Sequence, residues 1–324
     1  MSKIRCCLQR CKTSKPLHYV IQHTVTIFVI AIFFVSHSLQ PIFLSLVSAF
    51  LFALGAQFQN LGLAHMDSRS GAAITISTSA ILYLLASPFF LKLENLMHPA
   101  ALIFVAVGLF RPAVSANLAL AGMRFLGPTL SSTLTSTAPL FGVGLGIIFL
   151  GEILTIPIAI GTVVIVLAIM MLAKKDEGIS TNWPLWALVL PIGAAAIRAF
   201  AHVLTKIGME QVPDAYLAGL IGFVVSAVIT FCIHKLRHQT QATNLRNRGT
   251  GWFMGASVCF SLAVISLNTA LHTGQVIQVV PIVAASPIFT LLLSITIFRR
   301  ELITGKLVVA VLMVVPAVAL IATA

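Results

Sequence analysis

Charged residues are scarce in this chain, and acidic residues are the scarcest of them. Charged residues make up 9% of the 324 positions, and only 8 are Asp or Glu against 20 Lys and Arg. Hydrophobic residues make up 59%, and the mean hydropathy is +1.04. No polar segment is long enough to form a separate soluble domain. This composition excludes a water-soluble globule and indicates an all-α integral membrane protein.

Several chemical motifs are absent as well. The sequence contains no HExxH, no GxSxG, no P-loop and no paired aspartates within an apolar segment, which disfavours an integral-membrane enzyme. Cys7 and Cys11 have the wrong spacing for CxxC and no paired histidines accompany them, so no metal site is expected. No cofactor is expected either. A membrane receptor or sensor would need a ligand-binding or signalling domain, which the short loops do not provide.

The net charge of +12 does not indicate nucleic-acid binding, because the basic residues lie in short loops beside apolar segments. If the N-terminus is cytoplasmic, nearly all Lys and Arg residues in the loops lie on the cytoplasmic side, and only Lys92 and Lys206 lie on the outer side. Arg111 and Arg198 fall inside spans. This bias predicts a multi-pass protein of the plasma (inner) membrane, with an extracytoplasmic C-terminus and the lipid bilayer as its surroundings. The apolar segments that give this orientation are 19–37, 42–63, 71–91, 99–120, 128–150, 155–173, 184–206, 214–234, 251–271, 276–298 and 304–323.

The first segment, 19–37, has two interpretations. Its basic start and apolar stretch are typical of a signal peptide. The stretch is longer than an ordinary signal sequence and no Ala-x-Ala follows it, which favours a retained helix. Residues 1–38 are therefore expected to form a basic cytoplasmic tail and an extra N-terminal span, and the other ten segments are spans 1 to 10.

A short pattern occurs twice, about half a chain apart. Ala138-Pro139-Leu140-Phe141 is followed by Glu152 and Thr155, and Ser286-Pro287-Ile288-Phe289 by Glu301 and Thr304. The pattern divides the ten spans into repeats at 42–173 and 184–323. Because five is an odd number, the second repeat must be inverted relative to the first, which is how many secondary transporters are built.

The duplicated [AS]-P-[LI]-F…E-x-x-T pattern resembles the EamA-type transporters of the drug/metabolite transporter superfamily. The resemblance implies a ten-span core around a central cavity, lined largely by spans 1, 3, 4, 6, 8 and 9, with spans 5 and 10 at the periphery. It also implies a secondary transporter that works by alternating access and moves a small metabolite, more often outward than inward. The alternative within the superfamily is a drug or toxic-compound exporter. The sequence does not indicate an oligomeric state.

Arg111 and Arg198 are the two charges inside the spans, where an arginine costs roughly 2.5–3.5 kcal/mol on insertion scales. Gly108, Arg111 and Ser115 share one face of span 3, and Arg198 and His202 share one face of span 6. Two interpretations remain open. The arginines line the cavity and attract an anionic or carboxylate-bearing substrate, or they bind carbonyls freed near Pro112 or groups on neighbouring spans, as structural cross-links.

No Asp or Glu lies in the middle of a span, and span 1 carries Gln57, Gln59 and Asn60 but no carboxylate. Small multidrug relatives in the superfamily use a buried glutamate in their first span, so a proton-coupled exporter of cationic drugs is disfavoured. His202 is the one deeply placed histidine and is expected to be neutral and hydrogen-bonded.

Matching prolines in the two halves predict broken helices, which are the best sequence indication of a transport site. Hydroxyl and amide side chains near these prolines would either bind substrate or pack between helices. Glu152 and Glu301 begin spans 5 and 10, where a carboxylate complements a helix N-terminus, and are expected to be structural. The remaining substrate-cavity candidates are Ser132, Ser136, Ser257, Ser261, Asn268, Gln278 and Ser286, and the helix-break candidates are Pro112, Pro139, Pro281 and Pro287.

Overall fold

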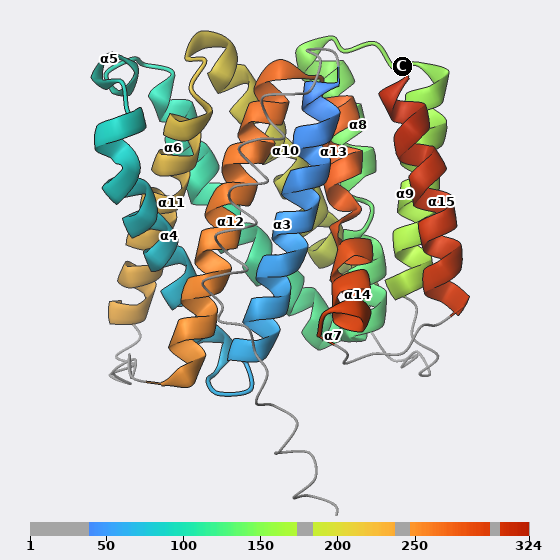
Figure 1. Ribbon diagram of the computed structural model, residues 1–324, viewed down its shortest axis with the longest axis horizontal. Helices are drawn as coiled ribbons and strands as arrows, with labels where there is room; N and C mark the ends of the chain where they lie inside the picture. Colours follow the sequence, from blue (N-terminus) through green and yellow to red (C-terminus); the bar gives the residue numbers. More distant parts are fainter. Residues whose placement is uncertain (1–38, 174–183, 237–246, 299–304, 324) are drawn as a thin grey trace, which may run out of the picture. The chain divides into compact units, whose positions relative to one another are not determined.

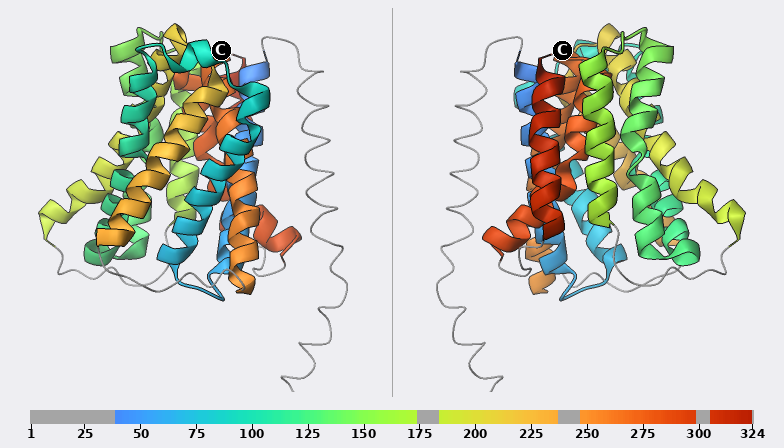
Figure 2. Two further views of the ribbon diagram at one scale, coloured as in Figure 1. Left: turned by 90° about the vertical axis from the view of Figure 1, so that its left-hand side faces the viewer. Right: turned by 90° about the vertical axis from the view of Figure 1, so that its right-hand side faces the viewer.

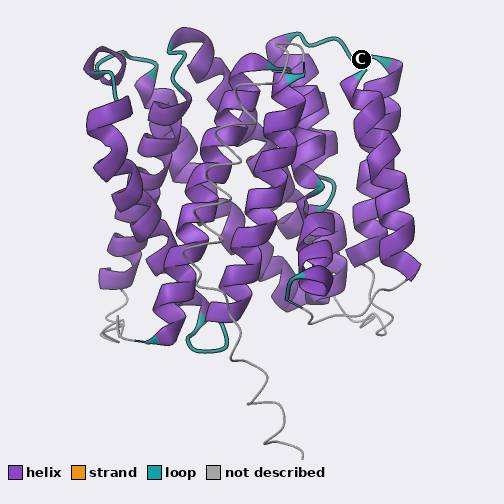
Figure 3. Ribbon diagram, viewed as in Figure 1, coloured by secondary structure: helices purple, strands orange, loops and turns teal. Residues whose placement is uncertain are grey.

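The computed structural model describes residues 39–173, 184–236, 247–298 and 305–323. The chain divides into two units, Met1–Gln40 and Pro41–Ala324, and the helices described here belong to the second unit apart from the first residue of α3. All regular elements in the described ranges are helices, with no strand among them (Figure 3). The extra span expected at 19–37 lies outside the described residues.

The first repeat runs from α3 to α9 (Figure 1). Local signals explain where its helices begin and end. The Asp67 carboxylate accepts a hydrogen bond from the Ser70 backbone N–H at 3.0 Å and so caps α4. Helix α8 ends at Gly151, whose φ of 64° favours glycine. The elements are α3 (Gln40–Gly62), α4 (Ser68–Phe90), α5 (Leu93–Leu96), α6 (Ala101–Leu109), a π-helical turn (Phe110–Val114), α7 (Ser115–Thr135), α8 (Ala138–Leu150) and α9 (Ile156–Ala173).

The second repeat is inverted relative to the first, as the sequence predicts. Helix α3 begins at the end of the bundle where α15 finishes, whereas its counterpart α10 ends there (Figure 1). The other helix pairs of the two repeats also run in opposite directions. The elements are a 3₁₀ turn (Leu185–Leu188), α10 (Val189–Gln211), α11 (Ala215–Leu236), α12 (Arg248–Thr273), α13 (Val276–Ala284), α14 (Ser286–Thr296) and α15 (Gly305–Ala322).

Eight helical stretches in the described ranges are long and apolar enough to cross a membrane. Two of the ten expected spans fall short of that measure. Span 3 is interrupted at Arg111, and the apolar part of span 5 covers only Ile156–Leu172. The count of ten spans therefore stays a prediction. The eight stretches are Gln40–Gly62, Ser70–Phe90, Thr133–Leu150, Leu185–Gln211, Ala215–Cys232, Arg248–Thr273, Val276–Thr296 and Gly305–Ala322.

Helix α7 contains the turn between spans 3 and 4. The Ser131 hydroxyl oxygen lies only 3.0 Å from the position that a Cβ on Gly122 would occupy. Nine residues of straight helix would separate the two by about 13.5 Å. The chain must therefore reverse within α7, which brings the end of span 3 beside the start of span 4.

Helices α9 and α15, which correspond to spans 5 and 10, pack side by side at one edge of the bundle (Figure 2). Their contact is close because a Cβ on Gly161 would lie 2.6 Å from the Ile321 side chain. On the other face of α15, Leu312 and Val315 are exposed, as expected for side chains that contact lipid. This position matches the periphery that the family resemblance implies for both helices.

Candidate functional site

The helix of span 3 breaks in the middle of the bundle at Arg111. Its backbone has φ −114° and ψ 133°, an extended conformation between α6 and α7. The cause is local, because Pro112 disfavours a helical conformation in the residue before it. Pro112 also lacks the N–H that would bond the Gly108 carbonyl one turn earlier. The break therefore leaves carbonyl groups without their helical partners.

Ser226 of α11 satisfies these carbonyls. Its single hydroxyl hydrogen is shared between the Arg111 carbonyl oxygen at 2.8 Å and the Gly108 carbonyl oxygen at 3.2 Å. A hydroxyl from a neighbouring helix is a usual way to satisfy a broken membrane helix. The Arg111 guanidinium is thus not needed for this task, and within the described ranges it has no hydrogen-bond or ion-pair partner.

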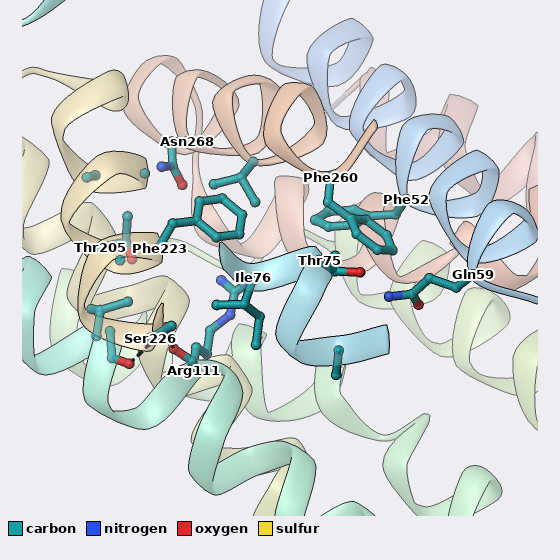
Figure 4. Close-up of a pocket in the computed structure, with 17 residues that line it drawn as sticks. Phe52, Gln59, Thr75, Ile76, Arg111, Thr205, Phe223, Ser226, Phe260 and Asn268 are labelled. Atoms are coloured by element: carbon teal, nitrogen blue, oxygen red, sulfur yellow. Dashed lines mark hydrogen bonds between the residues drawn. The ribbon is translucent and has the colours of Figure 1, made fainter. Parts of the chain in front are cut away.

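A cavity of about 340 Å³ lies against this break. The Arg111 side chain points from the break towards Phe223 and Ile76, and the Phe52 and Phe260 rings close the opposite side beside Gln59 (Figure 4). The lining residues are Phe52 and Gln59 of α3; Ala72, Thr75 and Ile76 of α4; Val107, Gly108 and Arg111 at the break; Thr205 of α10; Ala218, Gly219, Gly222, Phe223 and Ser226 of α11; and Phe260, Val264 and Asn268 of α12.

The electrostatic character of the cavity is positive. Arg198 and His202, one turn apart on α10, both lie close enough to Arg111 to interact with it electrostatically. His202 is 8% exposed, and its Nδ1 atom has no hydrogen-bond partner among the described residues. None of the described residues that line the cavity is acidic.

Two of the lining helices, α4 and α11, are spans 2 and 7, which the family resemblance did not place at the cavity. Conversely, α8 and α13 of spans 4 and 9 contribute none of its described lining residues. The sequence did contain a signal for α11, because Ala218, Gly222 and Ser226 repeat every four residues and form one stripe of small side chains. That stripe leaves the space that the cavity occupies.

Of the candidate polar residues, Arg111 and Asn268 line the cavity. The Asn268 side-chain amide donates to the Ala215 carbonyl oxygen at 3.1 Å. Ser257 is buried and donates to the Phe253 carbonyl oxygen at 2.8 Å. The other described candidates are not among the lining residues: Arg198 and His202 lie on α10 near Arg111, Ser115 and Ser261 are buried, Gln278 is half-buried on α13, and Ser136 and Ser286 flank helix breaks. The side chains of Ser132 and Pro112 are outside the described part.

Helix breaks occur at matching places in the two repeats. Span 4 is divided between α7 and α8 immediately before Pro139, and span 9 between α13 and α14 immediately before Pro287. Pro281 is different from what the sequence predicts, because it lies inside α13 and the helix continues to Ala284. The break instead comes at the residues before Pro287, where that proline fits the first turn of α14.

Glu152 complements a helix N-terminus, but not that of α9, which follows it in the sequence. Its carboxylate accepts hydrogen bonds from the Val276 and Ile277 backbone N–H groups at 2.7 and 2.9 Å, at the start of α13. Lys206 donates a hydrogen bond to the Gly274 carbonyl oxygen at 2.9 Å, at the end of α12. The α12–α13 turn is thus stabilised by an anion from the α8–α9 connection and a cation from α10. Glu301 lies outside the described residues.

Within the described ranges, no group of His, Cys, Asp and Glu side chains is arranged to hold a metal ion. The arrangement of the helices agrees with the comparisons with known proteins. A crystal structure described only as "Crystal structure of protein" has a TM-score of 0.73 and 14% sequence identity, over 86% of this chain and 95% of its own. At that identity the likeness supports the fold alone.

No curated protein is found that matches this sequence. The model of the EamA-like transporter family matches it twice, at residues 39–174 and 185–323. These two matches cover most of the chain and fall on the two inverted halves of the bundle. The chain therefore belongs to the EamA-like transporter family, within the drug/metabolite transporter superfamily.

Proposed function

We propose that this membrane transporter is a secondary transporter that binds a small carboxylate-bearing metabolite in the cavity at Arg111 and carries it by alternating access. Outward movement follows from the family resemblance, and a plasma (inner) membrane location with a cytoplasmic N-terminus follows from the charge bias. Substrate and bilayer are the only partners that the proposal requires.

The observation that carries the proposal is that the Arg111 guanidinium has no hydrogen-bond or ion-pair partner among the described residues. An arginine within a span is costly, so it needs either a structural task or a ligand. One structural task expected from the sequence, bonding the carbonyls at the break, is performed by Ser226. The other, a bond to a neighbouring span, has no partner for the guanidinium among the described residues. A carboxylate pairs with a guanidinium through two parallel hydrogen bonds, and no acidic lining residue competes for that role in the described part.

Alternating access is supported by the inverted repeats and by the broken helices at matching positions. Spans 4 and 9 divide before Pro139 and Pro287, so the two halves have hinges in equivalent places. Exchange of the two conformations between halves would open the cavity first to one side and then to the other.

An exporter of cationic drugs is the second candidate, and the cavity chemistry disfavours it. A cation would need a carboxylate partner, whereas Arg111 with nearby Arg198 would repel it. An enzymatic role is disfavoured by the family and by the absence of catalytic motifs in the sequence.

The test begins with a metabolite comparison, inside and outside, of cells that lack or overproduce the protein. Metabolites that change in opposite directions are then tested in proteoliposomes with the purified protein. The proposal expects a carboxylate to be transported by the wild type and the Arg248→Gln variant but not by Arg111→Gln. Arg248 is a matched control because it is an exposed cation at the start of α12 that does not line the cavity. Transport of an organic cation that survives Arg111→Gln would refute the proposal.

A further inference from the structure

We infer that the cavity selects monocarboxylates with an apolar, preferably aromatic, body and without an amino group. This inference rests on the proposed recognition of a carboxylate by Arg111 and adds the chemistry of the rest of the substrate. Three independent features of the lining lead to it.

The first feature is a set of fixed aromatic rings. The Phe52 and Phe260 rings lie together with centroids 6.0 Å apart, on the side of the cavity away from Arg111 (Figure 4). On the other side, Phe223 packs against Tyr83 with a centroid separation of 5.3 Å. Rings held in this way offer flat apolar surfaces to a ligand at little cost in conformational entropy. The body of the substrate should therefore be apolar.

The second feature is that the hydroxyl groups of the lining have already used their donors. The Thr75 and Thr205 hydroxyls donate to the Gly71 and Ala201 carbonyl oxygens one turn earlier in their own helices, at 3.0 and 2.7 Å. Ser226 and Asn268 also donate to backbone carbonyls. A sugar or another polyhydroxy compound would leave its own hydroxyl groups unpaired in such a cavity.

Apart from one N–H of Asn268, the lining donors that remain free within the described residues belong to Arg111 and Gln59. They lie on different sides of the cavity, with the aromatic rings around the space between them (Figure 4). One anionic group at Arg111, an apolar body and one small polar group near Gln59 would fit this arrangement.

The third feature is the absence of a partner for an ammonium group. None of the described lining residues is acidic, and an ammonium near Arg111 would also be repelled by Arg198. A buried charge without a partner is strongly unfavourable. An amino acid should therefore bind worse than the same molecule without its amino group.

Four matched compounds test these features with the purified full-length protein. 3-Phenylpropionate has the carboxylate and the ring, phenylalanine adds an ammonium, 3-phenylpropanamide removes the charge, and malate replaces the ring by polar groups. Binding is measured by titration, and transport by counterflow in proteoliposomes. We expect 3-phenylpropionate to bind about 100-fold more tightly than phenylalanine. It should bind more than about tenfold more tightly than malate, since even one methylene in an apolar pocket changes binding by about that factor.

Each outcome decides one of the claims. Phenylalanine or malate binding as tightly as 3-phenylpropionate overturns this inference, while a weakly bound amide in the same experiment keeps the proposed carboxylate recognition intact. An amide that binds as tightly as the acid, or no binding by any compound at millimolar concentration, overturns both.

A substitution at Gly222 tests whether the apolar body of the substrate lies in this cavity. Gly222 lines the cavity, and a Cβ there would meet no other atom within 4 Å, so a larger side chain would enter open space without a clash. Gly222→Leu should weaken 3-phenylpropionate binding more than about tenfold at an unchanged unfolding temperature. Gly144→Leu is the matched control, because its Cβ also meets open space but it does not line the cavity. Equal binding by the two variants overturns the assignment of this cavity.

Discussion

Replacement of Arg111 by glutamine should separate substrate binding from stability. The change keeps a polar side chain at the helix break but removes the charge that faces the cavity. A hydrogen bond to a charged group contributes about 1.5–3 kcal/mol, and each 1.4 kcal/mol corresponds to a factor of ten, so substrate affinity should fall by about 10- to 150-fold. Arg111→Lys should have an intermediate affinity, because lysine keeps the charge but not the paired donors.

Arg111→Gln should not lower the stability of the protein, although it weakens substrate binding. Arg111 has no hydrogen-bond or ion-pair partner to lose among the described residues, and the carbonyls at the break are bonded by Ser226. Removal of a charge that costs roughly 2.5–3.5 kcal/mol within a membrane should leave the protein as stable as the wild type or more stable.

The assay measures both quantities on one preparation. Purified protein in detergent is titrated with the substrate, and unfolding without substrate is followed by tryptophan fluorescence. Arg248→Gln serves as the charge control outside the cavity and should match the wild type in affinity. A lower unfolding temperature for Arg111→Gln together with unchanged affinity would refute the reasoning and identify Arg111 as a structural cross-link.

Three further predictions concern the scaffold. Ser226→Ala should lower the unfolding free energy, measured by denaturant titration, by about 0.6–1.7 kcal/mol, which is the range for hydrogen bonds within membranes. An unchanged value would show that other groups satisfy the Gly108 and Arg111 carbonyls. Glu152→Gln should destabilise by about 1 kcal/mol because a neutral amide caps α13 less well, whereas Glu94→Gln, at an exposed position on α5, should not. A C-terminal reporter that is active only outside the cytoplasm should be active, and activity of a cytoplasm-only reporter would contradict the predicted orientation.

Much of the fold follows from local properties of the sequence. Each apolar span and each flanking cation reports how one helix partitions between lipid and water, so the membrane class and the inversion of the repeats were predictable. The breaks near Pro112, Pro139 and Pro287 were predictable for the same reason, because a proline acts on the backbone one turn around it. The position of Pro281 inside α13 shows the limit of that rule, since the surrounding helix tolerates one missing donor.

The candidate site was only partly predictable. Arg111 and Asn268 do line the cavity, but Ser257 lies away from it and bonds its own helix. The contribution of α11 was missed because its stripe of small residues looks like an ordinary packing surface in the sequence. Whether such a stripe meets a neighbour or leaves a space depends on the helices opposite it.

The sequence by itself determined that this protein crosses a membrane, that its two halves are inverted, and that an arginine lies within span 3. Only the tertiary structure decided that Ser226 bonds the broken helix while the Arg111 guanidinium has no partner in the part of the chain that is described, and that Glu152 caps α13 of the other half. The physical reason is the distance along the chain over which each interaction acts. Partitioning and backbone geometry act within one helix, whereas a cavity and a hydrogen bond between helices depend on residues more than a hundred positions apart.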